Sequence, residues 1–181
     1  MKLCVFFPGI GYHCDKPLLY YGGRLAKSMG YETIALKYSD FPRGAKGNDD
    51  KIHTAADHAL MQSEQQLADI DFSAYEKVVL VGKSIGTAAC TAFREKHSVK
   101  AECVLLTPLA VTFEHDTVDS VAFHGTADPW ADTAEIRRLC KERGIPLYEY
   151  ENADHSLETG DVTKNIETVK DVTEKLRQVL E

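Results

Sequence analysis

The stretch Gly82-Lys83-Ser84-Ile85-Gly86 decides how the rest of the chain is interpreted. It follows the β-branched run Lys77–Val81, which predicts a buried strand, and it precedes Ala88–Phe93, which predicts a helix. A serine at a strand-to-helix turn, with glycine two positions away on each side, is the G-x-S-x-G pattern of a nucleophile elbow. Such a turn strains the serine backbone, and side chains at positions 82 and 86 would collide across it. The pattern therefore marks Ser84 as a candidate nucleophile.

Two other interpretations of the same stretch have to be weighed. The letters Gly-Lys-Ser also end a phosphate-binding loop, but that motif needs glycine at position 77, which is Lys77. The strand also runs directly into Gly82, which leaves no room for a loop around phosphates. A strand-turn-helix without chemistry is the second alternative, because five residues alone are a weak match. The rest of the chain has to decide.

The composition is that of an ordinary globular protein. The 181 residues are 44% hydrophobic and 27% charged, which predicts one domain spanning residues 1–181. A net charge of −7 disfavours nucleic acid and anionic membranes as partners. No apolar run approaches the roughly 20 residues of a membrane helix, and Leu3–Phe7 is too short for a signal-peptide core. The five cysteines lack C-x-x-C spacing, so we expect free thiols and a cytoplasmic location.

Strand patterns alternate with helical patterns along the whole chain. Predicted strands are Lys2–Phe7, Glu32–Tyr38, Lys77–Val81, Glu102–Leu106, Ser120–His124 and Pro146–Tyr150. Predicted helices are Leu18–Met29, His53–Ile70, Ile85–Lys96, Thr133–Arg143 and Asp161–Leu180, the last with a core face of Ile166, Val169, Val172, Leu176 and Val179. This alternation predicts an α/β fold, a three-layer sandwich around a mainly parallel sheet of about six strands. Ligands of such sheets bind at the carboxyl ends of the strands.

Two further residues complete a catalytic constellation with Ser84. A serine hydroxyl needs a base and an orienting acid, which follow an elbow in the order Asp or Glu, then His. Asp128 lies just past the strand Ser120–His124, and His155 lies in the loop after the last strand. Both the order and the positions at strand ends therefore predict a Ser84, Asp128, His155 triad.

Each of these positions has a competitor. Asp154 is adjacent to His155, where neighbouring side chains rarely face each other, and Asp132 suits the N-terminus of the following helix. His124 suits packing or a structural hydrogen bond. We therefore expect Asp128 to be the residue that orients the histidine.

The reaction also needs backbone donors for an oxyanion. One is the N–H of Ile85 after the nucleophile, and the second should come from the loop Phe7–Tyr12 after the first strand. Within this loop we assign the N–H of Ile10, although an ordinary glycine turn is the alternative. Candidate pocket residues near these groups are Gly9, Tyr12, His13, Lys83 and Trp130, with a solvated Lys83 favoured over one that attracts an anionic substrate.

Two other segments leave alternatives open. His13, Cys14 and Asp15 resemble metal ligands, but adjacent ligands seldom converge and no second cluster has zinc spacing, so no metal is expected. The polar residues 39–52 are either a lid over the site or a mobile surface loop.

These residues together resemble the α/β-hydrolase superfamily over nearly the whole chain. The resemblance is carried by Pro8–Gly11, Gly82–Gly86, His124–Asp128 and Asp154–Ser156. It is to small, lidless members similar to dienelactone-hydrolase-like and carboxylesterase-like proteins. The chain starts at what resembles the third strand of that fold, so the first two strands are lacking. Dienelactone hydrolases carry a cysteine nucleophile, and Ser84 stands in its place here.

The resemblance implies a serine esterase that acts on a small-molecule acyl substrate without a cofactor. A catalytically silent small-molecule-binding protein on the same scaffold is the alternative. The missing edge strands would expose one edge of the sheet, which is compatible with a homodimer. The acyl group and the choice between ester, thioester and amide remain open at this point.

Overall fold

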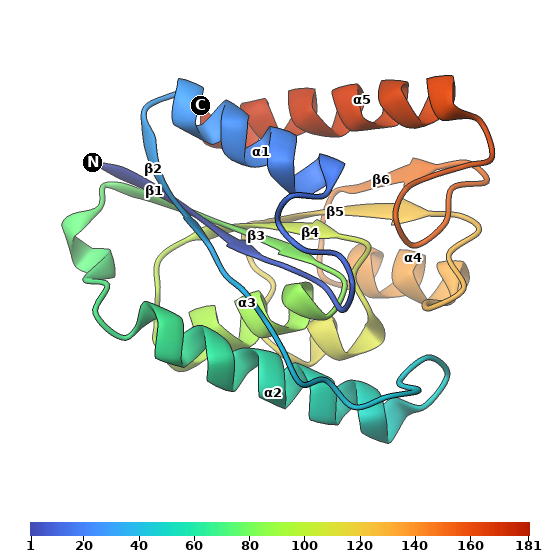
Figure 1. Ribbon diagram of the computed structural model, residues 1–181, viewed down its shortest axis with the longest axis horizontal. Helices are drawn as coiled ribbons and strands as arrows, with labels where there is room; N and C mark the ends of the chain where they lie inside the picture. The colour runs from blue at the N-terminus through green and yellow to red at the C-terminus, as the bar shows by residue number, and fades with distance from the viewer.

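Six parallel strands form one sheet in the computed structural model, which describes residues 1–181 (Figure 1). The strands are β1 (Lys2–Phe7), β2 (Tyr31–Ala35), β3 (Lys77–Lys83), β4 (Glu102–Leu106), β5 (Ser120–Gly125) and β6 (Leu147–Tyr150). Their order in the sheet is β2-β1-β3-β4-β5-β6, and every neighbouring pair is parallel. The predicted α/β sandwich around a parallel sheet is thereby confirmed.

Helices cover both faces of this sheet. On one face lie α1 (Pro17–Ser28) and α5 (Val162–Leu180), and on the other lie α2 (Asp49–Leu67), α3 (Ile85–Lys96) and α4 (Thr133–Glu142) (Figure 1). Short 3-10 helices occupy Phe72–Ala74 and Ala110–Glu114, the latter being the only regular structure between β4 and β5. None of the helices has the length and apolar character needed to cross a membrane.

The central strands are buried on both sides because two apolar layers sandwich them. Along β3, Val78 and Leu80 pack in the cluster with α2, α3 and α4, whereas Val79 and Val81 pack in the cluster with α1 and α5. This alternation is the period of two that a pleated strand imposes. Burial continues to the last residue of β3, Lys83.

The second strand and the following helix differ from their predicted bounds. We predicted a strand to Tyr38, but β2 ends at Ala35. The Gln66 side chain on α2 pairs with both backbone groups of Lys37, and Gln62 pairs in the same way with Ser39. These side chains replace a strand partner, so the backbone leaves the sheet without losing hydrogen bonds.

The helix after this segment begins earlier than predicted, at Asp49 rather than His53. Asn48 caps it by accepting from the N–H of Lys51, and Asp49 and Asp50 complement the positive end of the helix. Of the predicted loop 39–52, the last four residues therefore belong to α2.

The core face of the last helix was predicted partly wrongly. Val172, Leu176 and Leu180 are buried, but Ile166 is 66% exposed. The first half of α5 extends past the N-terminal end of α1, so no neighbouring helix covers that part (Figure 1).

Candidate active site

Ser84 sits on a strained turn between β3, which ends at Lys83, and α3, which begins at Ile85. Its φ of 56° and ψ of −124° are unusual for a residue with a side chain. A Cβ on Gly82 would lie 2.6 Å from the carbonyl oxygen of Gly86, and one on Gly86 would overlap the carbonyl oxygens of Phe7 and Pro8. The two glycines are thus required by space, as the pattern predicted.

Three side chains converge at the carboxyl ends of the strands. The Oγ of Ser84 lies 2.6 Å from Nε2 of His155. The Nδ1 of the same ring lies 2.7 Å from Oδ2 of Asp128. Because an ionised carboxylate only accepts, Nδ1 carries the proton and Nε2 is left to accept from the serine hydroxyl. The structure therefore brings the three sequence-predicted residues into one hydrogen-bonded chain.

The carboxylate end of this chain is enclosed and satisfied. The Asp128 side chain has no exposed surface, and its second oxygen accepts from the backbone N–H of Trp130 at 2.8 Å. The indole of Trp130 stacks on the imidazole of His155 with ring centroids 5.4 Å apart. Trp130 thus covers one face of the imidazole ring.

Hydrogen bonds between two loops set the distance from Asp128 to His155. The loop after β5 donates from Thr126 to the carbonyl of Tyr150 and from Ala127 to the carbonyl of Ala153. In return, the N–H of Asn152 donates to the Thr126 hydroxyl. Because β5 and β6 are neighbours in the sheet, these bonds extend the sheet's register into the loops that carry the two side chains.

The imidazole of His155 is poised to be neutral. Burial lowers the pKa of His155, since the charged form loses water, and the nearby Lys83 ammonium lowers it further. The hydrogen bond to Asp128 acts in the opposite direction without overcoming the burial. A neutral imidazole with a free Nε2 lone pair is the form that accepts a proton.

The two residues predicted to supply backbone donors are Ile85, which follows Ser84, and Ile10, which lies in the loop after β1. Ile85 is the first residue of α3, and first-turn N–H groups have no partner within a helix. A Cβ on Gly9 would lie 3.0 Å from Cβ of Ser84, so the loop after β1 passes directly against the serine. In this loop the N–H of Ile10 makes no hydrogen bond within the chain. Both N–H groups therefore lack a hydrogen-bond partner within the chain.

Lys83 differs most from its prediction. We favoured a solvated side chain, but Lys83 has no exposed surface. Its Nζ donates to Oγ1 of Thr107 at 2.6 Å and to the carbonyl oxygen of His155 at 2.7 Å, and it lies over the ring of Tyr12. A side chain at this position of a central strand is covered on both faces, and a substrate cannot reach it.

Thr107 is a site residue that the sequence did not reveal. It follows β4, is fully buried, and has a φ of 47°, which is rare for a β-branched residue. Its hydroxyl donates to the carbonyl oxygen of His155 at 3.1 Å. No sequence pattern predicts a strained threonine at this position.

The remaining predicted pocket residues separate into buried and exposed ones. Tyr12 is buried, and its hydroxyl accepts from the N–H of Leu18, so it supports the loop. His13 is exposed and lies 3.4 Å from Asp15. The thiol of Cys14 instead lies against the carbonyl oxygens of Phe6 and Leu36, so the three adjacent residues do not form a cluster of metal ligands.

The competing acidic residues have other tasks. Asp154 accepts from the N–H groups of Ser156 and Glu158, and so shapes the loop around His155. Asp132 caps α4 by accepting from Glu135. His124 is buried and bonds the Thr133 hydroxyl through Nε2.

An apolar wall flanks the serine on the side of α2. Ile85 packs there in a cluster with Ala55, Ala88, Leu109 and Val111, and partly exposed side chains border it: Phe41, Ile52, Ala56, Trp130 and Ala131. Phe41 belongs to the loop for which a lid was one alternative, so this loop packs beside the site.

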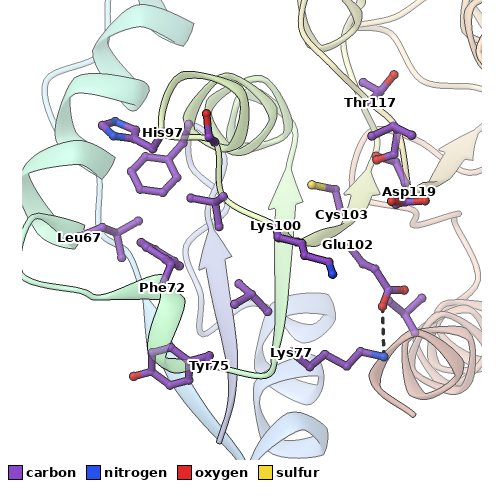
Figure 2. A pocket seen from close by; sticks show the side chains of 18 of the residues that line it. Leu67, Phe72, Tyr75, Lys77, His97, Lys100, Glu102, Cys103, Thr117 and Asp119 are labelled. Carbon is purple, nitrogen blue, oxygen red and sulfur yellow. Dashed lines mark hydrogen bonds and ion pairs between the residues drawn. The ribbon is translucent and has the colours of Figure 1, made fainter.

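A large cavity lies at the opposite end of the strands, where they begin. It measures about 1320 Å³ and is lined by residues at or just before the first residues of the strands, among them Lys77, Glu102 and Asp119 (Figure 2). Ser84, Asp128 and His155 do not line it. The cavity and the three candidate catalytic side chains therefore lie at opposite ends of the strands.

Comparisons with known proteins show similarity in structure only. No family model matches the sequence, and no curated protein matches it. Among solved structures, an α/β-superfamily protein from Xanthomonas campestris pv. campestris has a TM-score of 0.63 at 15% identity, with 98% of this chain and 99% of that chain covered.

Two further solved structures superpose over almost the whole chain. Est1E from Butyrivibrio proteoclasticus, which was also solved with ferulic acid bound, has a TM-score of 0.65 at 11% identity, with 99% of this chain and 88% of that chain covered. An α/β serine hydrolase without a lid from Xanthomonas campestris has a TM-score of 0.59 at 12% identity, with 98% and 81% covered. The chain has the fold of an α/β hydrolase.

Proposed function

We propose that this protein is a serine hydrolase that cleaves a carboxylic ester of a small molecule through an acyl-enzyme. The observation that carries the proposal is the hydrogen-bonded chain from Ser84 through His155 to Asp128. The lowered pKa of His155 supports it, because the base must be neutral before it can accept a proton.

In the first half of the reaction, the Oγ of Ser84 attacks the ester carbonyl carbon while Nε2 of His155 takes the hydroxyl proton. The carbonyl oxygen becomes an oxyanion, which accepts from the N–H groups of Ile85 and Ile10. Asp128 keeps the imidazole in its tautomer and stabilises the imidazolium. The tetrahedral intermediate then expels the alkoxide, which receives the proton from His155 and leaves as the alcohol.

In the second half, water attacks the acyl-Ser84 ester and gives a proton to Nε2 of His155. The second tetrahedral intermediate collapses, the Ser84 oxygen leaves and regains its proton from His155, and the carboxylic acid departs. Water, substrate and groups of this chain account for every atom in these steps.

The apolar wall supports an acyl group of modest size and low polarity. Ile85 follows the nucleophile, and Phe41 and Trp130 border the same cluster, so a carbon chain or ring attached to the carbonyl would contact apolar side chains. Est1E binds ferulic acid, an aromatic carboxylic acid of the kind that ester cleavage releases. Short aliphatic and aromatic esters are therefore the first substrates to assay.

Hydrolysis of p-nitrophenyl acetate and butyrate tests the proposal. The Ser84→Ala variant should lose turnover by about 10⁴-fold or more, and Ser28→Ala, which removes an exposed hydroxyl on α1, should keep it. Turnover by Ser84→Ala equal to that of the wild type would overturn the assignment.

A fluorophosphonate probe separates an enzyme from a silent binding protein. The probe reacts only with an activated serine, so labelling at pH 8 should occur in the wild type and disappear in Ser84→Ala. An unlabelled wild-type protein would favour the binding protein instead.

A further inference from the structure

A lysine without a carboxylate partner is buried directly behind the candidate triad. Lys83 is fully buried, and its hydrogen-bond acceptors are both neutral, the hydroxyl of Thr107 and the backbone carbonyl of His155. Burial of an ammonium is costly unless its hydrogen bonds are well made. A buried ammonium next to a candidate nucleophile therefore suggests that Lys83 has a function in the site.

A strained residue after the neighbouring strand, Thr107, also binds the carbonyl oxygen of His155. Thr107 adopts a φ of 47°, and this conformation places its hydroxyl between the two partners, accepting from Lys83 and donating to His155. Strain of this kind is energetically unfavourable and persists where surrounding contacts impose it. Two donors from two adjacent strands thus converge on one oxygen.

The oxygen that Lys83 and Thr107 bind is the backbone carbonyl oxygen of His155, the candidate base. His155 lies in an irregular loop between β6 and α5, where it has no strand or helix partners. The backbone bonds of its neighbours Asp154 and Leu157 stay within the loop. Lys83 and Thr107 are therefore the link between the backbone of His155 itself and the central strands.

We propose that Lys83 and Thr107 are positioning residues for His155. They hold its backbone carbonyl so that the imidazole meets Ser84, and the cation of Lys83 disfavours a second positive charge on the ring. The first of these roles concerns geometry, and the second concerns the protonation state of the base; both deepen the proposed hydrolase function and rest on it.

The charges around Lys83 support the second role. Burial lowers the pKa of Lys83 to about 7, and Asp128 and Asp154, the carboxylates that face it, act in the opposite direction. The ring of Tyr12 covers the ammonium with its centroid 4.9 Å away. Below pH 7 Lys83 is therefore charged, and its repulsion contributes to the lowered pKa of His155.

The first test compares two lysines of the same strand. Lys83→Met keeps the length of the side chain and removes its charge and donors, whereas Lys77→Met changes a lysine at the other end of β3. For Lys83→Met we expect kcat to fall about ten- to hundredfold with little change in KM, since misplacement of a catalytic group by about 1 Å costs about 10²-fold. Lys77→Met should behave as the wild type.

The pH profile distinguishes positioning from a loss of packing. Without the Lys83 cation, the pKa of His155 should rise, so the acid limb of kcat/KM should move to higher pH. NMR titration of the His155 imidazole should show the same rise in a Ser84→Ala background. That measurement needs no turnover, so it stands even where the proposed hydrolase function fails.

The second test uses Thr107, which changes geometry without removing a charge. Thr107→Val has nearly the same shape but lacks the hydroxyl, and Thr107→Ser keeps the hydroxyl. We expect Thr107→Val to lower kcat about tenfold or more and Thr107→Ser to retain most of the wild-type rate. Rescue by serine would show that the hydroxyl, and not the packed methyl group, carries the effect.

Two outcomes would overturn the inference while leaving the proposed function standing. One is an unchanged pH profile and imidazole titration in Lys83→Met. The other is an equal kcat in Thr107→Val and the wild type. Loss of the proposed function would appear elsewhere, as full turnover or probe labelling in Ser84→Ala.

Discussion

The strand β3 begins and ends with a lysine, and the two side chains have opposite surroundings. Lys77 at the amino end lies 3.2 Å from Glu102 and borders the large cavity, where Figure 2 shows the pair. Lys83 at the carboxyl end has no exposed surface and no carboxylate partner within hydrogen-bonding distance. The same residue type on one strand is thus a half-exposed ion pair at one edge and a buried donor at the other.

The side of the sheet where the strands begin (the amino edge) and the side where they end (the carboxyl edge) differ in the same way as the two lysines. The amino edge has volume, about 1320 Å³, and an ordinary surface ion pair. The carboxyl edge has strained backbone at Ser84 and Thr107 and a closed network of polar groups. Strain and buried polar groups are costly, so they persist where structure or chemistry requires them. They locate the candidate site, whereas the size of a hollow does not.

The largest expected effect comes from matched changes of two aspartates, one at each edge. Asp128→Asn should lower kcat about 10⁴-fold, because the amide no longer holds His155 in the tautomer that can accept from Ser84. Asp119→Asn, in the lining of the large cavity, should leave ester hydrolysis unchanged. Steady-state kinetics on p-nitrophenyl butyrate measures both. A loss of activity in Asp119→Asn would contradict the placement of the active site at the carboxyl ends of the strands.

Two glycines provide the next largest contrast, in stability. A Cβ on Gly86 would overlap the backbone of Phe7 and Pro8, which cannot move without displacing β1, so Gly86→Ala should cost more than about 4 kcal/mol or prevent folding. Gly144, beside the large cavity, has a φ of +66° and open space around it. Gly144→Ala should cost only about 1 kcal/mol, the strain of its backbone. Denaturant unfolding compares the two, and equal costs would contradict the tight elbow.

The burial of Lys83 predicts how stability depends on pH. Its pKa is lowered from 10.5 to about 7 in the folded state, so above pH 7 the unfolded chain binds the extra proton. The free energy of unfolding should therefore rise with pH, relative to Lys83→Met, by up to about 1.4 kcal/mol per pH unit between pH 7 and 9. Urea unfolding of both proteins at three pH values measures the difference. A difference that does not change with pH would mean that Lys83 stays charged.

The sequence predicted the parallel sheet and the convergence of Ser84, Asp128 and His155 because both follow local rules. Alternating patterns define the strands and helices, and the carboxyl ends of parallel strands meet at one edge, which brings Ser84, Asp128 and His155 together in any such fold. It did not predict the buried Lys83 or the role of Thr107. Both depend on which loops cover a strand end, and that is decided by tertiary packing.

The same limit explains two predictions that were wrong, the end of β2 and the burial of Ile166. Tyrosine is common in strands, which favoured a strand up to Tyr38. The backbone on either side of Tyr38 instead pairs with glutamine side chains of α2. Ile166 follows the helical period, but its burial depends on how far α1 extends along α5. Periodicity predicts which face of a helix is apolar, and only the packed neighbours decide how much of that face is covered.

The smallest expected effect is at Lys77, where the comparison between the two lysines can be tested from the other side. Its ion pair with Glu102 is partly exposed to solvent, so water and salt screen it. Lys77→Met should change the free energy of unfolding by less than about 1 kcal/mol, and the change should shrink further in 1 M salt. A double-mutant cycle with Glu102→Gln isolates the pair. The contrast between the two lysines depends on the burial of Lys83 at the carboxyl end of β3. It would be contradicted by a coupling energy between Lys77 and Glu102 as large as the change in the free energy of unfolding caused by Lys83→Met.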